Sequence, residues 1–359
     1  MKIDKIDVNL AVGSDLGNIE ADFRSAASAE FALYGLLAPD DEEPYYKRMP
    51  KKIASAVSSG VVNLSRCTAG GRIRFSTDSS FVAISAKMTD MDIARMPHMP
   101  LTGSAGFDLY ASHPGDRYDM YIGTFKPPYD MSDHYESVVY FPERGDWNVT
   151  INFPLYAGVQ ALYIGLEKGS KLGKGKEYAN SKPVLYYGSS ITQGGCASRP
   201  GTCYQAFVSQ LLECDYINLG FSGNARAEKA MADYLAEIDA AVFVCDYDHN
   251  APNVEHLEKT HYPLYERYRQ SNPATPVIFL NRPKPYLTGE EIRRRDVIKA
   301  TYDRAVSNGD KNVYFIDMST IYEPVFCEGI TVDGAHPNDL GYMYMARALA
   351  PLIGKLLKK

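Results

Sequence analysis

The chain has 359 residues, of which 45% are hydrophobic and 23% are charged, and its formal net charge is -6. This composition is that of an ordinary soluble globular protein, and the length exceeds that of a usual single core, so we expect two domains. It holds no apolar stretch long enough to span a membrane and no basic run long enough to follow a nucleic-acid backbone. The basic cluster at residues 293–295 lies in a helical pattern and is interpreted as a solvated helix face.

The N-terminal residues and the cysteines indicate the cellular compartment. Residues 1–7 alternate charged and apolar side chains and lack the apolar core of a signal peptide. We therefore expect a cytoplasmic protein, or a secreted one if a leader peptide was removed. The six cysteines are scattered without a Cys-x-x-Cys pair, which favours reduced thiols over a disulfide framework or a zinc site. The sequence indicates no metal and no organic cofactor.

The first part of the chain, residues 1–168, is predicted to be a β-sandwich of the jelly-roll type. Residues 72–76 and 82–88 alternate polar and apolar side chains around a turn-like segment, which predicts a hairpin. Many short strands with turn signals between them are typical of sandwiches and jelly rolls. Further strands are expected at residues 119–123, 137–141 and 147–153.

The pattern changes after residue 168. Residues 169–182 are rich in Gly and Lys and are interpreted as a linker. In residues 183–359, apolar runs of strand length alternate with amphipathic helical stretches, which predicts an α/β domain with a five-stranded parallel sheet between helices. The expected strands are 184–187, 216–221, 240–247, 276–280 and 312–318. The expected helices are 204–213, 225–238, 254–270, 289–306 and 339–357, the last with Asp339 as its N-cap.

Polar residues follow these strands at the edge where open α/β sheets bind ligands. Ser190 follows the first strand, Gly223 the second and Asn250 the third, and Asp333 and His336 come after the fifth. A serine needs an adjacent base, for which histidine is suited, and a carboxylate holds the imidazole in one tautomer. A glycine N–H and an Asn amide can stabilise an oxyanion, each such donor being worth roughly 3–4 kcal/mol. Together these residues favour nucleophilic acyl transfer.

Each of these residues also has a purely structural interpretation. Ser190 could cap the following helix, and Gly223 could permit a positive φ. Asn250 could be a turn residue before Pro252, and His336 could lie in a surface loop. The occurrence of all of them in this order at one sheet edge favours the catalytic interpretation.

Residues 188–194 resemble the first block of the SGNH-type, or GDSL-like, esterases. Gly223 matches the second block of that family, Asn250 the third and residues 333–336 the last. The resemblance covers essentially all of residues 183–359 and implies a three-layer α/β/α, flavodoxin-like domain.

The resemblance also implies the role of each residue. Ser190 is then the nucleophile, His336 the base and Asp333 the partner that orients the base. The backbone N–H groups of Ser190 and Gly223 and the side-chain amide of Asn250 form the oxyanion hole.

One position departs from the common pattern of the family. Ser189 stands where the first block usually has Asp, although a subgroup with an N-terminal β-domain also reads Gly-Ser-Ser-Ile-Thr. Residues 106–110 look like the Gly-x-Asp-Leu-Tyr signature of that subgroup, and residues 153–156 and 162–165 are similar to its last β-domain strands. Members with this two-domain layout include carbohydrate esterases that remove acetyl groups from sugars.

The predicted function is that of a serine esterase acting on short O-acyl esters, with acetyl esters of saccharides as the expected substrates. Alternatives are a lipid or thioester acylhydrolase and a non-catalytic carbohydrate-binding protein. Arg199 and His249 are candidate substrate-binding residues, although a structural salt bridge for Arg199 and simple packing for His249 are equally compatible with the sequence. We expect a small-molecule or oligosaccharide ester as the partner, neither nucleic acid nor a membrane, and a homo-oligomer is compatible with the sequence.

Overall fold

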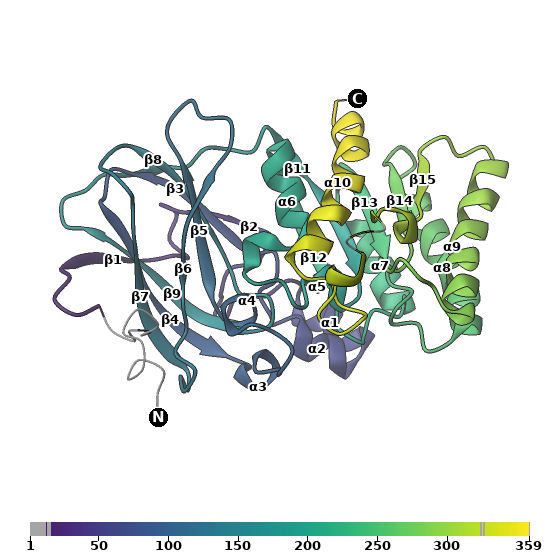
Figure 1. Cartoon of the computed structure of the whole chain (residues 1–359), viewed down its shortest axis with the longest axis horizontal. Coiled ribbons are helices and arrows are strands. Elements are labelled where there is room, and N and C mark those ends of the chain that lie inside the picture. The colour runs from purple at the N-terminus through teal and green to yellow at the C-terminus, as the bar shows by residue number, and fades with distance from the viewer. Residues whose placement is uncertain (1–11, 13–15, 324, 326, 359) are drawn as a thin grey trace. The chain divides into compact units, whose positions relative to one another are not determined.

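The computed structural model describes residues 12, 16–323, 325 and 327–358, and the chain divides into two compact units (Figure 1). The first comprises the described residues up to Lys47, together with Arg66–Lys176 and Ser198–Gly201. The second comprises the remaining described residues. The segment 48–65, which was expected in the first domain, is grouped with the second unit. The segment 198–201, which was expected in the second domain, is grouped with the first unit. The N-terminal residues 1–7, on which the expected compartment rests, lie outside the described residues.

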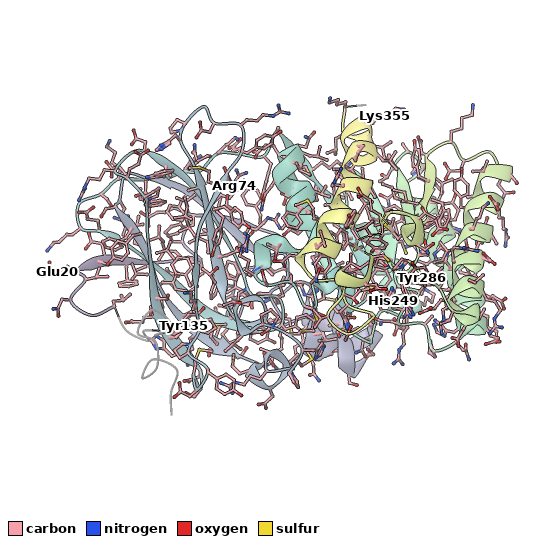
Figure 2. The ribbon with its side chains drawn as sticks, in the orientation of Figure 1. Glu20, Arg74, Tyr135, His249, Tyr286 and Lys355 are labelled. Carbon is pink, nitrogen blue, oxygen red and sulfur yellow. The ribbon has the colours of Figure 1, made fainter. Side chains whose placement is uncertain are left out.

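The first unit consists of two antiparallel sheets around one hydrophobic core. Its strands are β1 (Ala21–Ser25), β2 (Ala32–Tyr34), β3 (Arg72–Thr77), β4 (Phe81–Thr89), β5 (Phe107–Ser112), β6 (Met120–Phe125), β7 (His134–Tyr140), β8 (Trp147–Asn152), β9 (Gly158–Glu167) and β10 (Leu172–Lys174). One sheet has the order β1-β9-β4-β7, and the other has the order β10-β3-β8-β5-β6 with β2 paired to β3. Phe75 from one sheet and Ile84 and Tyr135 from the other belong to the same buried cluster. Figure 2 labels Tyr135 among the side chains of this unit. The predicted β-sandwich is confirmed.

The predicted hairpin of β3 and β4 is wrong. Both strands exist, but β3 pairs with β8 whereas β4 pairs with β7 and β9, so the two strands belong to different sheets. The connecting turn is bonded to the end of β9 and to the chain that follows it: Ser79 Oγ accepts the N–H of Glu167 at 2.9 Å, and Asp78 Oδ1 accepts the N–H of Lys171 at 2.7 Å. The turn held by these bonds leads from one sheet to the other and does not form a hairpin.

The Gly- and Lys-rich segment that was interpreted as a linker contributes an edge strand. Its β10 pairs with β3, with Leu172 opposite Thr77. The hydroxyl of Thr77 also donates to the carbonyl of Lys171 at 2.7 Å. Backbone pairing with an existing sheet does not require apolar side chains, which explains why the composition of this segment concealed the strand.

The second unit contains a five-stranded parallel sheet of order β12-β11-β13-β14-β15. The strands are β11 (Asn180–Gly188), β12 (Cys214–Gly220), β13 (Val242–Asp246), β14 (Val277–Leu280) and β15 (Val313–Ile316). The helices are α1 (Lys51–Val57), α2 (Ser59–Leu64), α5 (Ser190–Gln193), α6 (Tyr204–Leu212), α7 (Lys229–Glu237), α8 (Val254–Ser271), α9 (Gly289–Ser307) and α10 (Asp339–Leu356). The second unit also has the 3-10 helices η4 (Met318–Thr320) and η5 (Cys327–Gly329), and the first unit has the short helices α3 (Met91–Ala94) and α4 (Leu101–Ser104). The 3-10 helix η3 spans Pro200–Thr202. The predicted parallel sheet between helices is confirmed.

Alternation along β11 explains why helices cover both faces of the sheet. Tyr186 and Tyr187 are adjacent in the strand and therefore point to opposite faces. The Tyr186 ring packs against Tyr204 of α6 with a centroid distance of 5.5 Å, and Tyr204 stacks on Tyr342 of α10. The Tyr187 ring instead packs against Tyr247, on the side of α8. Both tyrosines are buried, which accounts for the continuous apolar run at the end of this strand.

One helix begins later than expected, and another has a different N-cap. α7 begins at Lys229 rather than 225, because Ala227 has a left-handed φ of 56° that interrupts a helix. The N-cap of α10 is Asn338, whose side chain accepts the N–H of Gly341, so the prediction of Asp339 as the cap is wrong by one residue. No helix in the described ranges combines the length and the apolar character needed to cross a membrane.

Arg48 bonds the segment 48–65 to the rest of the second unit. One guanidinium nitrogen of Arg48 donates to the carbonyl of Gly220 at the end of β12, and the other donates to the carbonyl of Leu64. The guanidinium also lies 4.7 Å from the centroid of the Phe221 ring. A buried arginine that satisfies backbone carbonyls in this way fixes the segment against the loop after β12.

Candidate active site

The turn from β11 into α5 places Ser190 at the carboxyl end of the sheet. Gly188 ends the strand where no side chain fits, because a Cβ there would lie 2.0 Å from the carbonyl oxygen of Asp246. Ser189 is the N-cap of α5, and its Oγ accepts the N–H of Ile191 at 3.2 Å. The capping role considered for Ser190 therefore falls to Ser189. Ser190 is the first residue of the helix and is 7% exposed.

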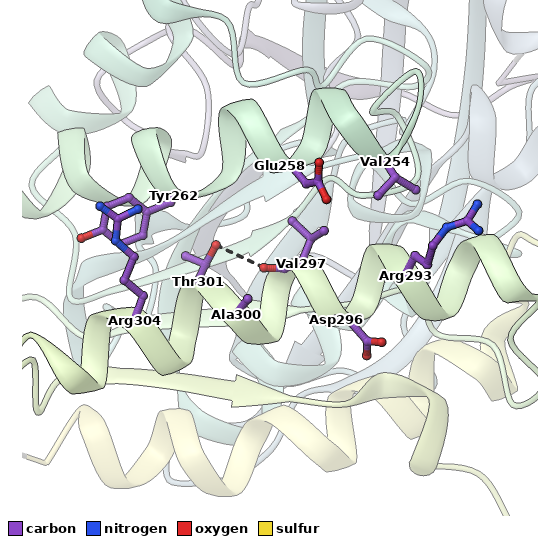
Figure 3. Close-up of a pocket in the computed structure, with 9 residues that line it drawn as sticks. All are labelled: Val254, Glu258, Tyr262, Arg293, Asp296, Val297, Ala300, Thr301 and Arg304. Atoms are coloured by element: carbon purple, nitrogen blue, oxygen red, sulfur yellow. Dashed lines mark hydrogen bonds between the residues drawn. The ribbon is translucent and has the colours of Figure 1, made fainter.

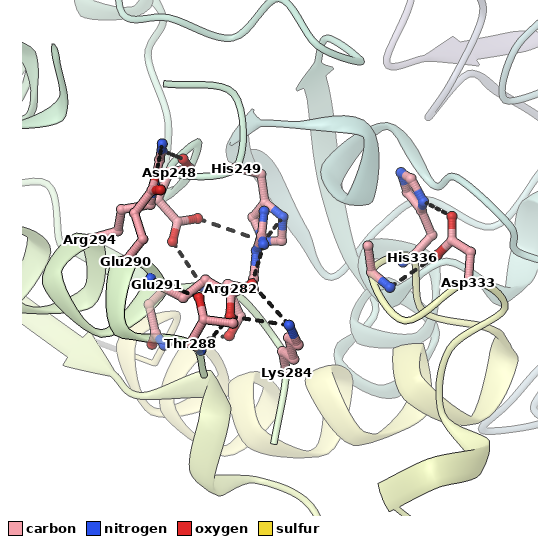
Figure 4. A network of polar contacts seen from close by, with 12 residues as sticks. Asp248, His249, Arg282, Lys284, Thr288, Glu290, Glu291, Arg294, Asp333 and His336 are labelled. Atoms are coloured by element: carbon pink, nitrogen blue, oxygen red, sulfur yellow. Dashed lines mark hydrogen bonds and ion pairs between the residues drawn. The ribbon is translucent and has the colours of Figure 1, made fainter. Parts of the chain in front are cut away.

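The Ser190 hydroxyl is hydrogen-bonded to an imidazole that contacts a carboxylate in turn. Ser190 Oγ lies 2.9 Å from His336 Nε2, and His336 Nδ1 lies 2.7 Å from Asp333 Oδ2. Figure 4 shows the Asp333 and His336 pair. Because the carboxylate accepts the proton on Nδ1, Nε2 is free to accept the serine proton. The three side chains thus form a continuous hydrogen-bonded chain from hydroxyl to carboxylate.

A tight turn holds Asp333 and His336 together. Gly334 occupies the left-handed region with a φ of 81°, and Asp333 Oδ1 accepts the backbone N–H groups of Ala335 at 3.0 Å and His336 at 2.8 Å. Partial burial alone raises the pKa of Asp333, but the hydrogen bonds from the backbone and ring of His336 and from Ala335 outweigh it and lower the pKa to about 2. Asp333 is therefore ionised at neutral and mildly acidic pH.

Gly223 and Asn250 lie in the loops after β12 and β13, the two strands that flank β11. Gly223 has a φ of 68°, and a Cβ there would meet no atom within 4 Å, so backbone conformation rather than space favours glycine. Asn250 Oδ1 accepts the N–H of Ala225 at 3.2 Å, which joins the two loops. Because its oxygen is engaged there, the Asn250 amide presents its NH₂ group away from Ala225. This group is available as a hydrogen-bond donor.

His249 lies in a buried network of charged side chains (Figure 4). Arg282 Nε donates to His249 Nδ1 at 3.0 Å, which places the ring proton on Nε2. Burial first, and then the positive charge of Arg282, lower the pKa of His249 well below its usual value, so the ring is neutral. Its packing with Arg282 is a structural role, and contact with substrate stays a prediction.

Asp246, Asp248 and His249 form a cluster that resembles a metal site by residue type. Their potential ligand atoms lie within 4.8 Å of one another. The bond from Arg282 to His249 Nδ1 makes Nε2 a proton donor, whereas a metal ligand must offer a lone pair. This tautomer leaves two carboxylates without an imidazole ligand, and the cluster does not fit a metal ion.

We expect this cluster to make stability depend on pH. Burial raises the pKa of Asp248 to about 6 from the usual 3.8, although Arg282 and Arg294 oppose the rise. Between about pH 4 and pH 6 the folded protein then holds a proton that the unfolded chain has lost, so stability falls as the pH rises through this window. Asp248→Asn has no carboxyl proton to lose at this position. The free energy of unfolding of the variant relative to that of the parent should therefore rise by up to about 3 kcal/mol between pH 4 and pH 7.

The melting temperatures of parent and Asp248→Asn at pH 4.5 and 7.5 test this expectation. The Tm of the variant minus the Tm of the parent should be larger at pH 7.5 than at pH 4.5. Asp303→Asn, which removes a carboxylate at an exposed position of α9, is the matched control. A Tm difference for Asp248→Asn that stays constant with pH would contradict the expectation.

Arg199 belongs to the first unit and is held by the Gly-x-Asp-Leu-Tyr segment. Its Nε lies 3.8 Å from Asp108 Oδ2 and 3.4 Å from the hydroxyl of Tyr110, and its guanidinium lies 4.2 Å from the centroid of the Tyr121 ring. The fully buried Asp108 also accepts the N–H of Gly201 at 2.8 Å. The structural salt bridge considered for Arg199 is present, and a contact with substrate stays a prediction.

A groove of about 470 Å³ lies between α8 and α9 (Figure 3). It is lined by Val254, Glu258, Tyr262, Arg293, Asp296, Val297, Ala300, Thr301 and Arg304. At one end the Arg304 guanidinium covers the Tyr262 ring at 3.5 Å. The groove contains none of the predicted site residues, so we do not assign it to the active site.

Two family models match this chain, one in each of the two parts predicted from the sequence. The family model described as GDSL-like lipase/acylhydrolase matches residues 181–354, and the one described as the N-terminus of SGNH-hydrolase-type esterases matches residues 21–172. Residues 181–354 thus resemble the GDSL-like lipases and acylhydrolases, and residues 21–172 resemble the N-terminal part of SGNH-type esterases. These matches confirm the family resemblance and the enzyme class expected from the sequence, that of an esterase or acylhydrolase. A search of curated proteins gives no match.

Several solved structures share the fold of this chain. A protein described as a GDSL-like lipase, from Bacteroides ovatus, is 28% identical, with a TM-score of 0.83 over 94% of this chain and 98% of that chain. A salicylyl-acyltransferase from a tetracycline biosynthetic pathway is 19% identical, with a TM-score of 0.73 over 92% and 97%. An acetyl xylan esterase from Butyrivibrio proteoclasticus is 12% identical, with a TM-score of 0.58 over 94% and 99%. The last two similarities establish the fold alone.

Proposed function

We propose that this protein is a serine esterase that hydrolyses short O-acyl esters, chiefly acetyl esters on saccharides, through an acyl-enzyme at Ser190. The observation that carries the proposal is the hydrogen-bonded chain from Ser190 Oγ through His336 to Asp333. A serine becomes a competent nucleophile at neutral pH when a base removes its proton during attack. His336 Nε2, at 2.9 Å, lies within reach of that proton.

In the acylation step, Ser190 Oγ attacks the ester carbonyl while its proton passes to His336 Nε2. The carbonyl oxygen becomes an oxyanion, to which the N–H groups of Ser190 and Gly223 and the Nδ2 group of Asn250 donate. Collapse of this intermediate breaks the bond to the sugar oxygen, which leaves with the proton from His336. Asp333, ionised at neutral pH, stabilises the imidazolium that forms in between.

In the deacylation step, a water molecule attacks the acyl group on Ser190 and gives its proton to His336 Nε2. The second tetrahedral intermediate uses the same donors as the first. Its collapse breaks the acyl bond to Ser190 Oγ, which regains the proton from His336, and the carboxylic acid is released. The chain of three side chains is thereby returned to its starting state.

The proposal of an acetyl ester on a saccharide rests on similarity of architecture. Among the structures that share both parts of this fold is an acetyl xylan esterase. That name describes the other protein, and at 12% identity it supports the substrate class only as a hypothesis. The triad itself would serve any short O-acyl ester, so substrate preference must be measured.

A series of p-nitrophenyl esters of increasing chain length, together with acetate release from acetylated xylo-oligosaccharides, tests the proposal. We expect the highest kcat/KM for acetate esters, and acetate release from the sugar. A preference for long acyl chains would favour a lipid acylhydrolase instead. Binding of the oligosaccharide without release of acetate would favour a non-catalytic carbohydrate-binding protein.

The proposed oxyanion hole predicts that Asn250→Ala lowers kcat by about 10²–10³-fold with little change in KM, because its amide donates mainly to the developing negative charge. The measurement is steady-state hydrolysis of p-nitrophenyl acetate. Asn253→Ala is a matched control, since Asn253 caps α8 through the N–H of His256 and should affect stability rather than kcat. Equal kcat values for Asn250→Ala and the parent would exclude this role for Asn250.

A further inference from the structure

Arg294 departs from the prediction made for its cluster. Residues 293–295 were interpreted as a solvated helix face, but the side chain of Arg294 is only 10% exposed. Arg293, the preceding residue on α9, is exposed as expected. A long cationic side chain is almost never buried unless it is paired, so the partners of Arg294 indicate its role.

The guanidinium of Arg294 bonds the loop that carries Asn250. Its Nη1 donates to the backbone carbonyl of Asp248 at 2.7 Å and to that of Ala251 at 2.8 Å. These carbonyls belong to residues on either side of Asn250 in the chain. Nε and Nη2 of Arg294 donate to Glu290 Oε1 at 3.0 and 2.8 Å, which fixes the plane of the guanidinium (Figure 4). The backbone around Asn250 is therefore held from α9 at two points.

A second arginine, Arg282, contacts the side chains of the same loop. The backbone N–H of Arg282 donates to Asp248 Oδ2 at 3.2 Å, and Arg282 Nε donates to His249 Nδ1 at 3.0 Å. Arg282 is itself paired with Glu291, whose carboxylate also accepts the Thr288 N–H in the capping box of α9. The segment after β14 thus bonds the two residues that precede Asn250, and the first turn of α9 bonds that segment through Glu291.

We infer that Arg294 is a positioning residue for the oxyanion hole: it holds the backbone on both sides of Asn250 so that the amide Nδ2 donates to the tetrahedral intermediate. The inference rests on the proposed function of Asn250. An oxyanion donor is effective only when it is preorganised, and a functional group must be held to within about 0.5 Å. Lysine keeps the positive charge at position 294 but has no planar fork that can hold two carbonyls and a carboxylate together.

A double-mutant cycle between Arg294→Lys and Asn250→Ala tests the inference, with p-nitrophenyl acetate as substrate. In the parent background, Arg294→Lys should lower kcat by about 10- to 100-fold and leave KM within about twofold, because misplacement acts on the transition state. In the Asn250→Ala background the same substitution should have almost no further effect on kcat, because the group that it misplaces is already absent. Arg293→Lys, an exposed neighbour with the same change, should leave kcat unchanged in both backgrounds.

The outcomes separate the inference from the function on which it rests. If Arg294→Lys slows both backgrounds by the same factor, Arg294 acts on general stability and the inference is wrong, while the serine esterase stands. An unchanged kcat in Arg294→Lys would also overturn it. If Asn250→Ala has no effect although Ser190→Ala is inactive, the oxyanion role of Asn250 fails, and the inference fails with it.

A second variant serves if Arg294→Lys does not fold, as judged by circular dichroism. Glu290→Gln leaves the guanidinium in place but removes the carboxylate that fixes its plane. We expect a smaller fall in kcat, about 2- to 10-fold, that again disappears in the Asn250→Ala background. Additive effects of Glu290→Gln and Asn250→Ala would contradict the inference in the same way.

Discussion

Ser190→Ala is expected to lower kcat for ester hydrolysis by about 10⁶-fold, the largest effect of any single substitution in this chain. The Ser190 hydroxyl is the atom that the His336 imidazole contacts at 2.9 Å, so its removal leaves the base without a nucleophile to activate. The variant should fold, because the substitution leaves the capping bond of Ser189 in place. Hydrolysis of p-nitrophenyl acetate by purified parent and variant is the measurement.

Ser189→Ala is the matched control for that experiment. Ser189 is fully buried and caps α5, so its replacement should lower stability by about 1 kcal/mol while kcat stays within a few-fold of the parent. Loss of activity in Ser189→Ala, with full activity in Ser190→Ala, would reverse the assignment of the nucleophile.

The second large effect is expected for Asp333→Asn, which should lower kcat by about 10⁴-fold at neutral pH. Asparagine fits the same space but can donate its amide proton to His336 Nδ1, which leaves the proton of the neutral ring on Nε2. That tautomer cannot accept the proton of Ser190. The pKa of Asp333 is lowered to about 2, so the parent keeps its carboxylate in assays at neutral and mildly acidic pH.

The control for Asp333→Asn is Asp317→Asn, because Asp317 also lies after the last strand of the sheet. Its carboxylate caps η4 through the N–H of Ser319 and accepts the Asn281 amide. We expect its replacement to affect stability and to leave kcat near the parent value. A kcat for Asp333→Asn within tenfold of the parent would show that the imidazole does not depend on this carboxylate.

The catalytic part of the fold was accessible from the sequence because its signals are local. The run that ends at Gly188 is fully buried in the structure, and burial on both faces of a sheet produces such continuous apolar strands. Parallel topology then brings the ends of β11, β12 and β13 to one edge, so that residues far apart in the chain become neighbours. Residues 333–336 form a short turn whose contacts are also local.

The missed features depend on contacts between distant segments. The alternation in β3 and β4 predicts that each is a strand, but it does not predict the partner of either. β3 pairs with β8 and β4 pairs with β9, both of which lie far away in the sequence. Arg294 was interpreted as part of a solvated helix face, and only the carbonyls that it reaches in the fold explain its burial. No local pattern marks a buried arginine that bonds a distant backbone, which is why the support of the Asn250 loop could not be predicted.

The most direct test of the proposed mechanism is to locate the acyl group on the enzyme. The protein is mixed with excess p-nitrophenyl acetate, quenched in acid within the first turnover and digested for peptide mass spectrometry. We predict that acetyl is found on Ser190 and is absent from that residue in His336→Ala treated in the same way. Acetyl on Ser189 instead, or turnover without any acylated intermediate under conditions where deacylation is slow, would contradict a mechanism through Ser190.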